Sequence, residues 1–411
     1  MRKGGKLEGW KVEKLGDVIQ KTETINPLQT PNKEFIYIDV SSVNNKTLSV
    51  EETSLIKGKD APSRARKLIK AGDVIFATVR PTLKRIAVIP EEYDHQVCST
   101  GYFVLRGKEF INNKYLFYYL QTDSFNERME KLQKGASYPA VTDTEVKEQI
   151  ISYPPLPEQQ RIVSVLDEAF ASIAQAKSNA ERNLVNAREL FDSYVGNIFA
   201  KSSEEWEEKK LGDKSIIEII DNDRGVNYPK KSDFHPEGYC LFMNTKNVRP
   251  DGFDFTTTMF ITEKKDKALG KGKLSRNDVV MTTRGTIGNL GVYNDEVPFE
   301  QIRTNSGMLI FRPNLKYIVP EYLFEILRSG IIKSQITKHV SGAAQPQLPI
   351  KTLVNFTFPL PKSLAEQRAI VGRLEALSAE TGRLEEIYQS KLEALEELKK
   401  SVLGKAFAGE L

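Results

Sequence analysis

The sequence contains the same ordered set of segments twice, and this duplication constrains the fold more than any other feature of the sequence. Three pairs of segments resemble each other in the same order in both halves: 72–89 and 277–293, 99–106 and 305–312, and 158–200 and 366–408. The last pair aligns without a gap, and its identical positions include Gln159/Gln367 and Phe199/Phe407. Two copies are too few for a solenoid, in which three or more repeats stack to bury a core. We therefore expect one unit, a globular part followed by a helical part, that is used twice.

The helical parts have the clearest periodicity. Apolar residues recur at alternating steps of three and four, which is the spacing of a coiled-coil seam, and single polar residues such as Lys177 and Lys391 interrupt it. We predict that the following residues belong to the seam: Leu166, Phe170, Ile173, Leu184 and Phe191 in the first helix, and Leu374, Leu377, Leu384, Leu395 and Leu398 in the second. Two long seams in one chain favour mutual pairing, and a pseudo-two-fold relation between the copies would make the helices antiparallel. The alternative is that each helix packs on its own globular part.

The globular parts are expected to be mixed α/β domains. Runs of β-branched and aromatic residues such as FIYIDV and MLIFR are typical of strands, and the segments 114–132 and 321–336 are expected to be helical. The predicted fold class is therefore α+β: two mixed α/β domains are separated by two long antiparallel helices that form a coiled coil, with an internal pseudo-two-fold repeat.

Composition excludes several protein classes. The chain has 59 Lys and Arg against 55 Asp and Glu, a net charge of +4, so any argument for a nucleic-acid partner depends on where the charge lies. The only cysteines, Cys98 and Cys240, form no CxxC motif and support neither a disulfide framework nor a zinc ribbon. No uncharged run approaches the ~18 residues of a membrane helix. We expect a cytoplasmic protein without a membrane partner.

Catalytic motifs are scarce. The three histidines lie far apart, and there is neither an HExxH motif nor a P-loop, so we expect no catalytic residue and no metal site. One loose match remains, because Asp251, Glu263 and Lys265 fit the pattern of Mg²⁺-dependent nucleases. That pattern is weak, since the first copy has nothing equivalent. A stand-alone nuclease and a coiled-coil scaffold without a DNA role therefore stay open as alternatives.

Basic residues gather at corresponding places in both copies, within 56–90 and 264–284. One such run is typical of any solvated surface, but its recurrence favours contact with phosphates. Arg suits guanine, Asn and Gln suit adenine, and Tyr can stack on a base. The candidate DNA-binding residues are Arg64, Arg66, Arg80, Lys84, Arg85, Ser137, Tyr138, Lys246, Asn247, Lys273, Arg284, Thr286, Asn289, Gln345 and Gln347. An alternative role for Ser137, Tyr138 and Gln345 is a turn that stabilises the return to the long helix.

Several motifs, in the same order in both halves, give the chain a family resemblance. They are the openings at 7–18 and 206–217, the GDVI…R element, the helix starts PPLPEQQRIV and PLPKSLAEQRAIV, and the terminal LGKAFAGEL. On these motifs the chain resembles the specificity (S) subunits of type I restriction-modification systems over nearly its full length. The second copy departs from the pattern at Asn277, where the first has Gly72, and by the inserted residues 362–364.

The resemblance implies a role and a domain plan. Target-recognition domain 1 (1–153) and target-recognition domain 2 (204–358) would each read one half of a bipartite site in double-stranded DNA. Spacer helices 1 (154–203) and 2 (359–411) would pair and dock two modification (methyltransferase) subunits, which restriction (translocase and nuclease) subunits join. S-adenosylmethionine, ATP and Mg²⁺ would then belong to those partners, so no cofactor is expected in this chain and it is not expected to be an enzyme.

Overall fold

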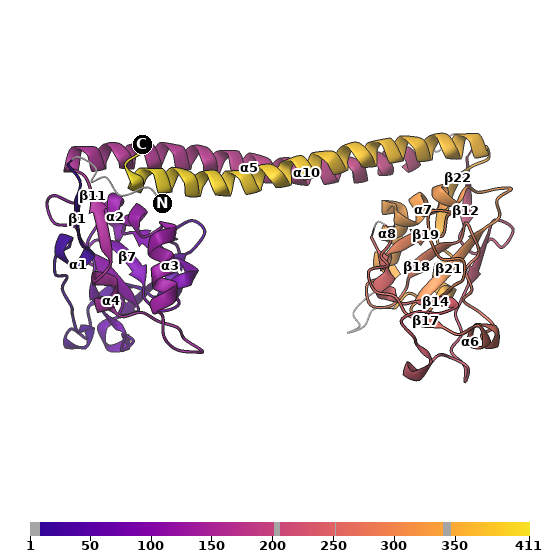
Figure 1. The fold of residues 1–411 in the computed structure, drawn as a ribbon, viewed down its shortest axis with the longest axis horizontal. Coiled ribbons are helices and arrows are strands. Elements are labelled where there is room, and N and C mark those ends of the chain that lie inside the picture. The colour runs from indigo at the N-terminus through magenta and orange to yellow at the C-terminus, as the bar shows by residue number, and fades with distance from the viewer. Residues whose placement is uncertain (1–8, 201–205, 251, 340–346) are drawn as a thin grey trace. The chain divides into compact units, whose positions relative to one another are not determined.

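The computed structural model describes residues 9–200, 206–250, 252–339 and 347–411 (Figure 1). The chain divides into two compact units. Unit 1 contains residues 1–181 and 389–411, and unit 2 contains residues 182–388. There are two long helices, α5 (Leu156–Ala200) and α10 (Leu364–Ala408). One part of each helix belongs to unit 1 and the other part to unit 2.

Unit 1 holds the first globular domain, which is called recognition domain 1 after its expected role and has two main sheets. Their strand orders are β10-β7-β8 and β5-β2-β9-β6. These strands are β2 (Glu34–Ile38), β5 (Ser54–Lys57), β6 (Ala65–Leu68), β7 (Val74–Ala77), β8 (Ile86–Val88), β9 (Val97–Ser99) and β10 (Tyr102–Leu105). The pairs β1 (Lys11–Lys14) with β11 (Ile150–Tyr153) and β3 (Val43–Asn44) with β4 (Ser49–Val50) lie outside them. The helices are α1 (Leu15–Val18), α2 (Asn113–Tyr119), α3 (Asp123–Leu132) and α4 (Asp143–Lys147).

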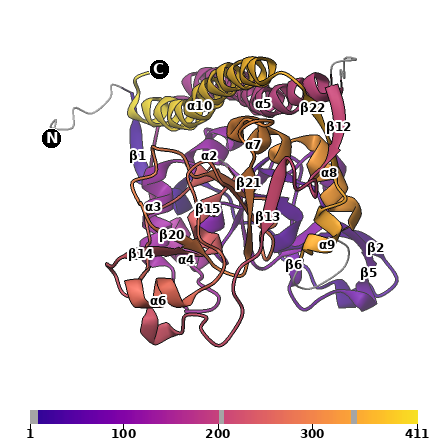
Figure 2. The ribbon, with the colours of Figure 1, turned by 90° about the vertical axis from the view of Figure 1, so that its right-hand side faces the viewer.

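Unit 2 holds recognition domain 2, whose main sheets have the orders β13-β21-β18-β19 and β17-β14-β20. These strands are β13 (Ile217–Ile220), β14 (Cys240–Met243), β17 (Phe260–Ile261), β18 (Val279–Thr282), β19 (Leu290–Val292), β20 (Ile302–Thr304) and β21 (Met308–Pro313). The further pairs are β12 (Trp206–Lys210) with β22 (Thr357–Pro361) and β15 (Val248–Arg249) with β16 (Gly252–Phe253). The helices are α6 (Glu263–Ala268), α7 (Pro320–Arg328), α8 (Gly330–His339) and α9 (Ile350–Leu353). Within this unit α7 lies between the sheet that contains β21 and the long helices (Figure 2).

The two domains share their internal supports, so the predicted repeat is confirmed. In each domain a buried aspartate that directly precedes one strand pairs with an arginine at or near the end of the neighbouring strand: Asp73 with Arg106, and Asp278 with Arg312. Each long helix also starts with a fully buried glutamine. The side chain of Gln159 accepts from the N–H of Asn112 and donates to the carbonyls of Phe110 and Pro154. Gln367 makes the matching bonds to Val319, Tyr317 and Pro361.

Asn277 has φ 77 and Gly72 has φ 80, so the departure from glycine leaves the turn unchanged, since Asn tolerates the left-handed region. The segments 114–132 and 321–336 each form two helices rather than one, with breaks at Thr122 and Ser329. Both hydroxyls donate to the carbonyl three residues earlier, which ends the first helix.

The long helices run antiparallel within each unit, as predicted. In unit 1 the first turns of α5 meet the end of α10, where Arg161 Nη2 donates to the carbonyl of Leu411 at 2.6 Å. In unit 2 Arg188 of α5 pairs with Glu385 of α10 at 2.8 Å. The alternative packing also occurs, because the start of α5 lies in the core of recognition domain 1 and the start of α10 in that of recognition domain 2.

The predicted seam is correct near the helix starts and wrong near the end of α10. Leu166, Ile173 and Leu374 are buried, and six predicted residues are half-buried: Phe170, Leu184, Phe191, Leu377, Leu384 and Leu395. Leu398 is 48% exposed, and its neighbour Lys399 points inward instead. An α-helix has 3.6 residues per turn and drifts from a strict 3.5-residue repeat. The last turns also pack on a domain, since Leu403 and Ala406 lie in the core of recognition domain 1.

Candidate nucleic-acid interface

The loop that follows β7 is held in an unusual backbone conformation. Arg80 and Lys84, which flank a short 3₁₀ helix (Pro81–Leu83), have φ angles of 51° and 52°. Residues other than glycine rarely adopt this left-handed region, and such positions cluster at functional sites. The turn exposes both basic side chains at the end of a central strand.

Candidates from two distant segments of the sequence, Arg80 in one and Ser137 and Tyr138 in the other, meet at this loop. The backbone N–H of Arg80 donates to the carbonyl of Pro139 at 2.6 Å, and its guanidinium donates to the carbonyl of Ser137 at 3.3 Å. The guanidinium also lies 4.9 Å from the ring centre of Tyr138, which is 71% exposed. Lys134 and Ala140 form a β-bridge that closes this segment into a tight loop, which is the local shape that the alternative role requires. An Arg on an exposed aromatic ring can both stack on a base and donate to its edge.

Other candidates of recognition domain 1 differ in what their side chains can reach. Arg85 donates to the carbonyls of Val40, Ser41 and Val43 at 2.8–3.1 Å, so its guanidinium fixes the loop at 40–43. Arg66 donates to the carbonyl of its own neighbour Ala65. Arg64 is exposed at the start of β6.

Recognition domain 2 presents a matching loop after β18 with different side chains. Arg284 forms a β-bridge with Gln347, just as Val79 does with Ala140 in recognition domain 1. Gln347 and Thr286 are exposed, and Arg284 is half-buried. The side chain of Asn289 donates to the carbonyl of Val248 at 2.9 Å and therefore supports the loop. Gln345 lies outside the described residues.

The remaining candidates of recognition domain 2 have mostly internal partners. Asn247 is buried and donates to the carbonyls of Asp254 and Thr257. Lys273 pairs with Asp266 at 2.5 Å, and that carboxylate also accepts from the buried Arg303. Burial raises the pKa of Asp266, but the two cations outweigh this effect and lower it. Lys246 is exposed on a short 3₁₀ helix (Thr245–Asn247).

Among the residues that the structure describes, Glu263 and Lys265 of the nuclease pattern are paired with other residues and do not form a site together. Glu263 pairs with Lys267 at 2.8 Å, and Lys265 pairs with Asp233 at 3.1 Å. Asp251 lies outside the part of the chain that the structure describes. Within that part, no group of three or more His, Cys, Asp or Glu side chains could hold a metal ion, and no helix is long and apolar enough to cross a membrane.

The amino-acid sequence is similar to those of known proteins over most of the chain. The family model for the type I restriction modification DNA specificity domain matches residues 7–182 and 203–394. The EcoKI specificity subunit of Escherichia coli K12 is 23% identical over 99% of this chain and 90% of its own length. The EcoBI specificity subunit of E. coli is 26% identical over 65% of this chain, and this match spans 59% of its own length.

Solved structures match over almost the whole chain. A chain from a study of complex assembly and conformational transition of the type I R-M system has a TM-score of 0.84 at 28% identity, with 98% of this chain and 99% of that chain covered. The HsdS subunit of Thermoanaerobacter tengcongensis has a TM-score of 0.69, also at 28% identity, with 98% of each chain covered. The chain therefore belongs to the family of type I restriction-modification DNA specificity subunits.

Proposed function

We propose that the chain is the DNA-recognition subunit of a type I restriction-modification complex, in which each recognition domain reads one half of a bipartite site in double-stranded DNA. One observation carries the proposal. The two domains have the same internal supports, including Gln159/Gln367 and the equivalent ion pairs Asp73–Arg106 and Asp278–Arg312. Their loops at the equivalent strand end expose different side chains, Arg80 and Tyr138 in one and Thr286 and Gln347 in the other. A common scaffold with different exposed side chains suits two readers of different sequences.

The chemistry is proposed to belong to partner subunits. Two modification subunits would dock on the long helices and use S-adenosylmethionine to methylate the DNA. Restriction subunits would use ATP and Mg²⁺ to translocate and cleave it. This chain would be a non-catalytic, cofactor-free member of the complex and would act in the cytoplasm.

A methylation assay with exchanged domains tests the proposal. The chain would be purified with its modification subunits and incubated with S-adenosylmethionine and genomic DNA, and the methylated positions would be sequenced. Replacement of residues 204–358 by the equivalent part of a relative should change one half of the site and leave the other half intact. A change in both halves would refute the assignment of one domain to one half-site. Methyl transfer or nicking by the chain alone would refute the non-catalytic role.

A further inference from the structure

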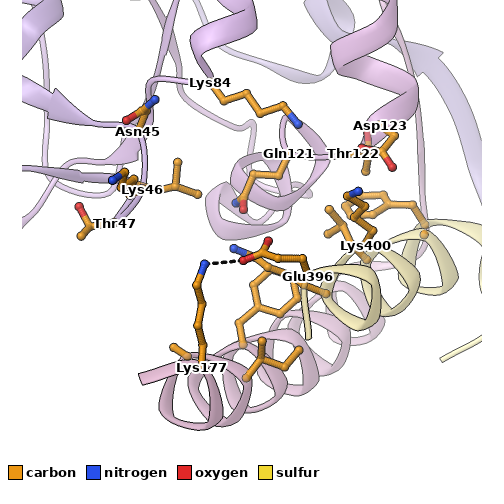
Figure 3. Close-up of a pocket in the computed structure, with 18 of the residues that line it drawn as sticks. Asn45, Lys46, Thr47, Lys84, Gln121, Thr122, Asp123, Lys177, Glu396 and Lys400 are labelled. Atoms are coloured by element: carbon orange, nitrogen blue, oxygen red, sulfur yellow. Dashed lines mark hydrogen bonds and ion pairs between the residues drawn. The ribbon is translucent and has the colours of Figure 1, made fainter. Parts of the chain in front are cut away.

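Unit 1 contains a groove between recognition domain 1 and the long helices. Figure 3 draws side chains that line it. Its volume is ≈ 950 Å³. The domain contributes the hairpin at 45–48, Lys84 and the start of α3, while α5 and α10 form the opposite wall. All of these segments belong to one compact unit.

Lysines dominate the charged lining of this groove. Lys46, Lys84, Lys177, Lys399 and Lys400 face three acidic residues, Asp123, Glu181 and Glu396. Two of the lysines are neutralised, because Lys177 pairs with Glu396 at 2.5 Å and Lys400 pairs with Glu397 at 2.7 Å. Lys46, Lys84 and Lys399 form no ion pair with any acidic side chain in the described part of the chain. Without these pairs, three lysines (Lys46, Lys84 and Lys399) stand against two acidic residues (Asp123 and Glu181), so the lining keeps a net positive charge, with cations on both of its walls.

Lys399 is the most constrained of these lysines. It is half-buried, and its Nζ lies 5.0 Å from the ring centre of Phe170 on α5. Burial lowers the pKa of Lys399, and the charges of Lys177 and Lys84 lower it further, although Glu396 opposes them. A cation that is partly withdrawn from water beside other cations gains from a bound anion.

The corresponding region of unit 2 lacks this charge. In the gapless alignment of the two helices, Phe191 stands where the second copy has Lys399. The hollow beside it is lined by three acidic residues, Glu321, Glu325 and Glu375, and one basic residue, Arg328. Arg328 is occupied, since it pairs with Glu325 and stacks on Phe191. The duplicated fold therefore does not require a basic groove, and the charge is particular to unit 1.

We propose that the groove of unit 1 binds the DNA backbone, with one phosphate contact from Lys84 of recognition domain 1 and another from Lys399 of α10. This inference rests on the proposed function and extends it. These contacts would fix the position of the duplex against the domain without reading a base, because phosphate contacts carry no sequence information. Recognition domain 1 would then bind DNA with an electrostatic component that recognition domain 2 lacks at the equivalent place.

The test compares charge-removing and charge-conserving variants in the assembled complex with modification subunits. Binding of a fluorescent cognate duplex would be titrated at several salt concentrations for Lys84→Gln, Lys399→Met, Lys399→Arg and wild type. Each lost phosphate contact should reduce the slope of log K against log salt by about 0.9, so wild type should lose about 3.5-fold more affinity than Lys399→Met between 50 and 200 mM salt. Lys399→Arg should keep the wild-type slope. Lys391→Met is the matched control, since Lys391 is exposed on α10 outside the groove.

The outcomes separate this inference from the proposed function. The methylated sequence should be the same for every variant. A wild-type slope for Lys399→Met, with the protein still folded by circular dichroism, would refute the groove as a phosphate site while leaving the proposed function intact. Absence of site-specific binding by the wild-type complex would refute the proposed function itself. Calorimetric titration with inorganic phosphate or ATP, in the absence of DNA, tells whether the groove is instead a site for small phosphate compounds. The backbone contact would be refuted if Lys399→Met abolished the binding of these small compounds but left the salt dependence of DNA binding unchanged.

Discussion

Replacement of Gln159 by leucine should selectively destabilise unit 1. The side chain of Gln159 is fully buried and makes three hydrogen bonds of 2.8–2.9 Å to backbone groups of Asn112, Phe110 and Pro154. These bonds join the first turn of α5 to the segment that precedes α2 and to the strand end that leads into the helix. Leucine has a similar volume, so Gln159→Leu removes the bonds while leaving little empty space.

The expected magnitude follows from the groups left without partners. The N–H of Asn112 and the carbonyls of Phe110 and Pro154 lose a partner, and the carbonyl of Pro154 is in a buried bond. An unsatisfied buried group costs about 1–3 kcal/mol, and the cost is lower for carbonyls, which have a second lone pair, and for groups that water can reach. The extra apolar contact of leucine offsets part of this cost. We expect a net loss of about 3 kcal/mol. For a unit of this size the melting temperature should then fall by about 6–12 °C.

Hydrogen exchange measures the effect where it arises. The amide of Asn112 should lose about a hundredfold of its protection in Gln159→Leu, whereas the amide of Val319, held by Gln367 in unit 2, should keep its protection. Gln367→Leu should give the reverse pattern. Gln160→Leu is the control, since Gln160 is exposed on the same turn and its replacement should change stability by less than about 0.5 kcal/mol. Equal melting temperatures for Gln159→Leu and Gln160→Leu would refute the reasoning.

Three further predictions concern the helix pair, the exposed loop and a buried carboxyl group. Reversal of one charge, by Lys177→Glu or Glu396→Lys, should lower the stability of unit 1, and the double reversal should restore most of it. A double-mutant cycle should give a coupling energy of about 0.2–1 kcal/mol. A coupling energy of zero would contradict the ion pair seen at 2.5 Å. Arg80→Ala and Tyr138→Ala should relax the methylated sequence in one half-site by about 1–3 kcal/mol per lost base contact, and an unchanged methylation profile would exclude both as readers. Burial raises the pKa of Glu325, so the folded state holds its proton more tightly than the unfolded state does. The stability of unit 2 should therefore fall as the pH rises from the pKa of this group in the unfolded state through its pKa in the folded state. Denaturant titrations at a series of pH values should show this fall, and Glu325→Gln should flatten it.

The sequence alone determined the duplication, the long helices, their antiparallel pairing and the family. Each of these depends on local or repeated signals, namely the spacing of apolar residues and the order of motifs in two halves. The same signals correctly indicated the inward position of Leu166 and Leu374 near the starts of the helices. The seam pattern did not predict that Lys399 would lie inward and Leu398 outward, because a domain packs against the last turns of α10 and changes which face of the helix is covered.

Only the tertiary structure decided which basic side chains are available to a partner. Arg80, Lys84 and Arg85 are neighbours in sequence and have the same charge, yet Arg85 is bound to carbonyls more than forty residues away while Lys84 lines the groove. Tyr138 and Arg80 lie together because the segment 134–140 folds back beside β7, and no spacing rule predicts that contact. The charge of a residue is a property of the sequence. Its availability depends on hydrogen-bond acceptors contributed by distant segments, which only the folded chain brings within reach.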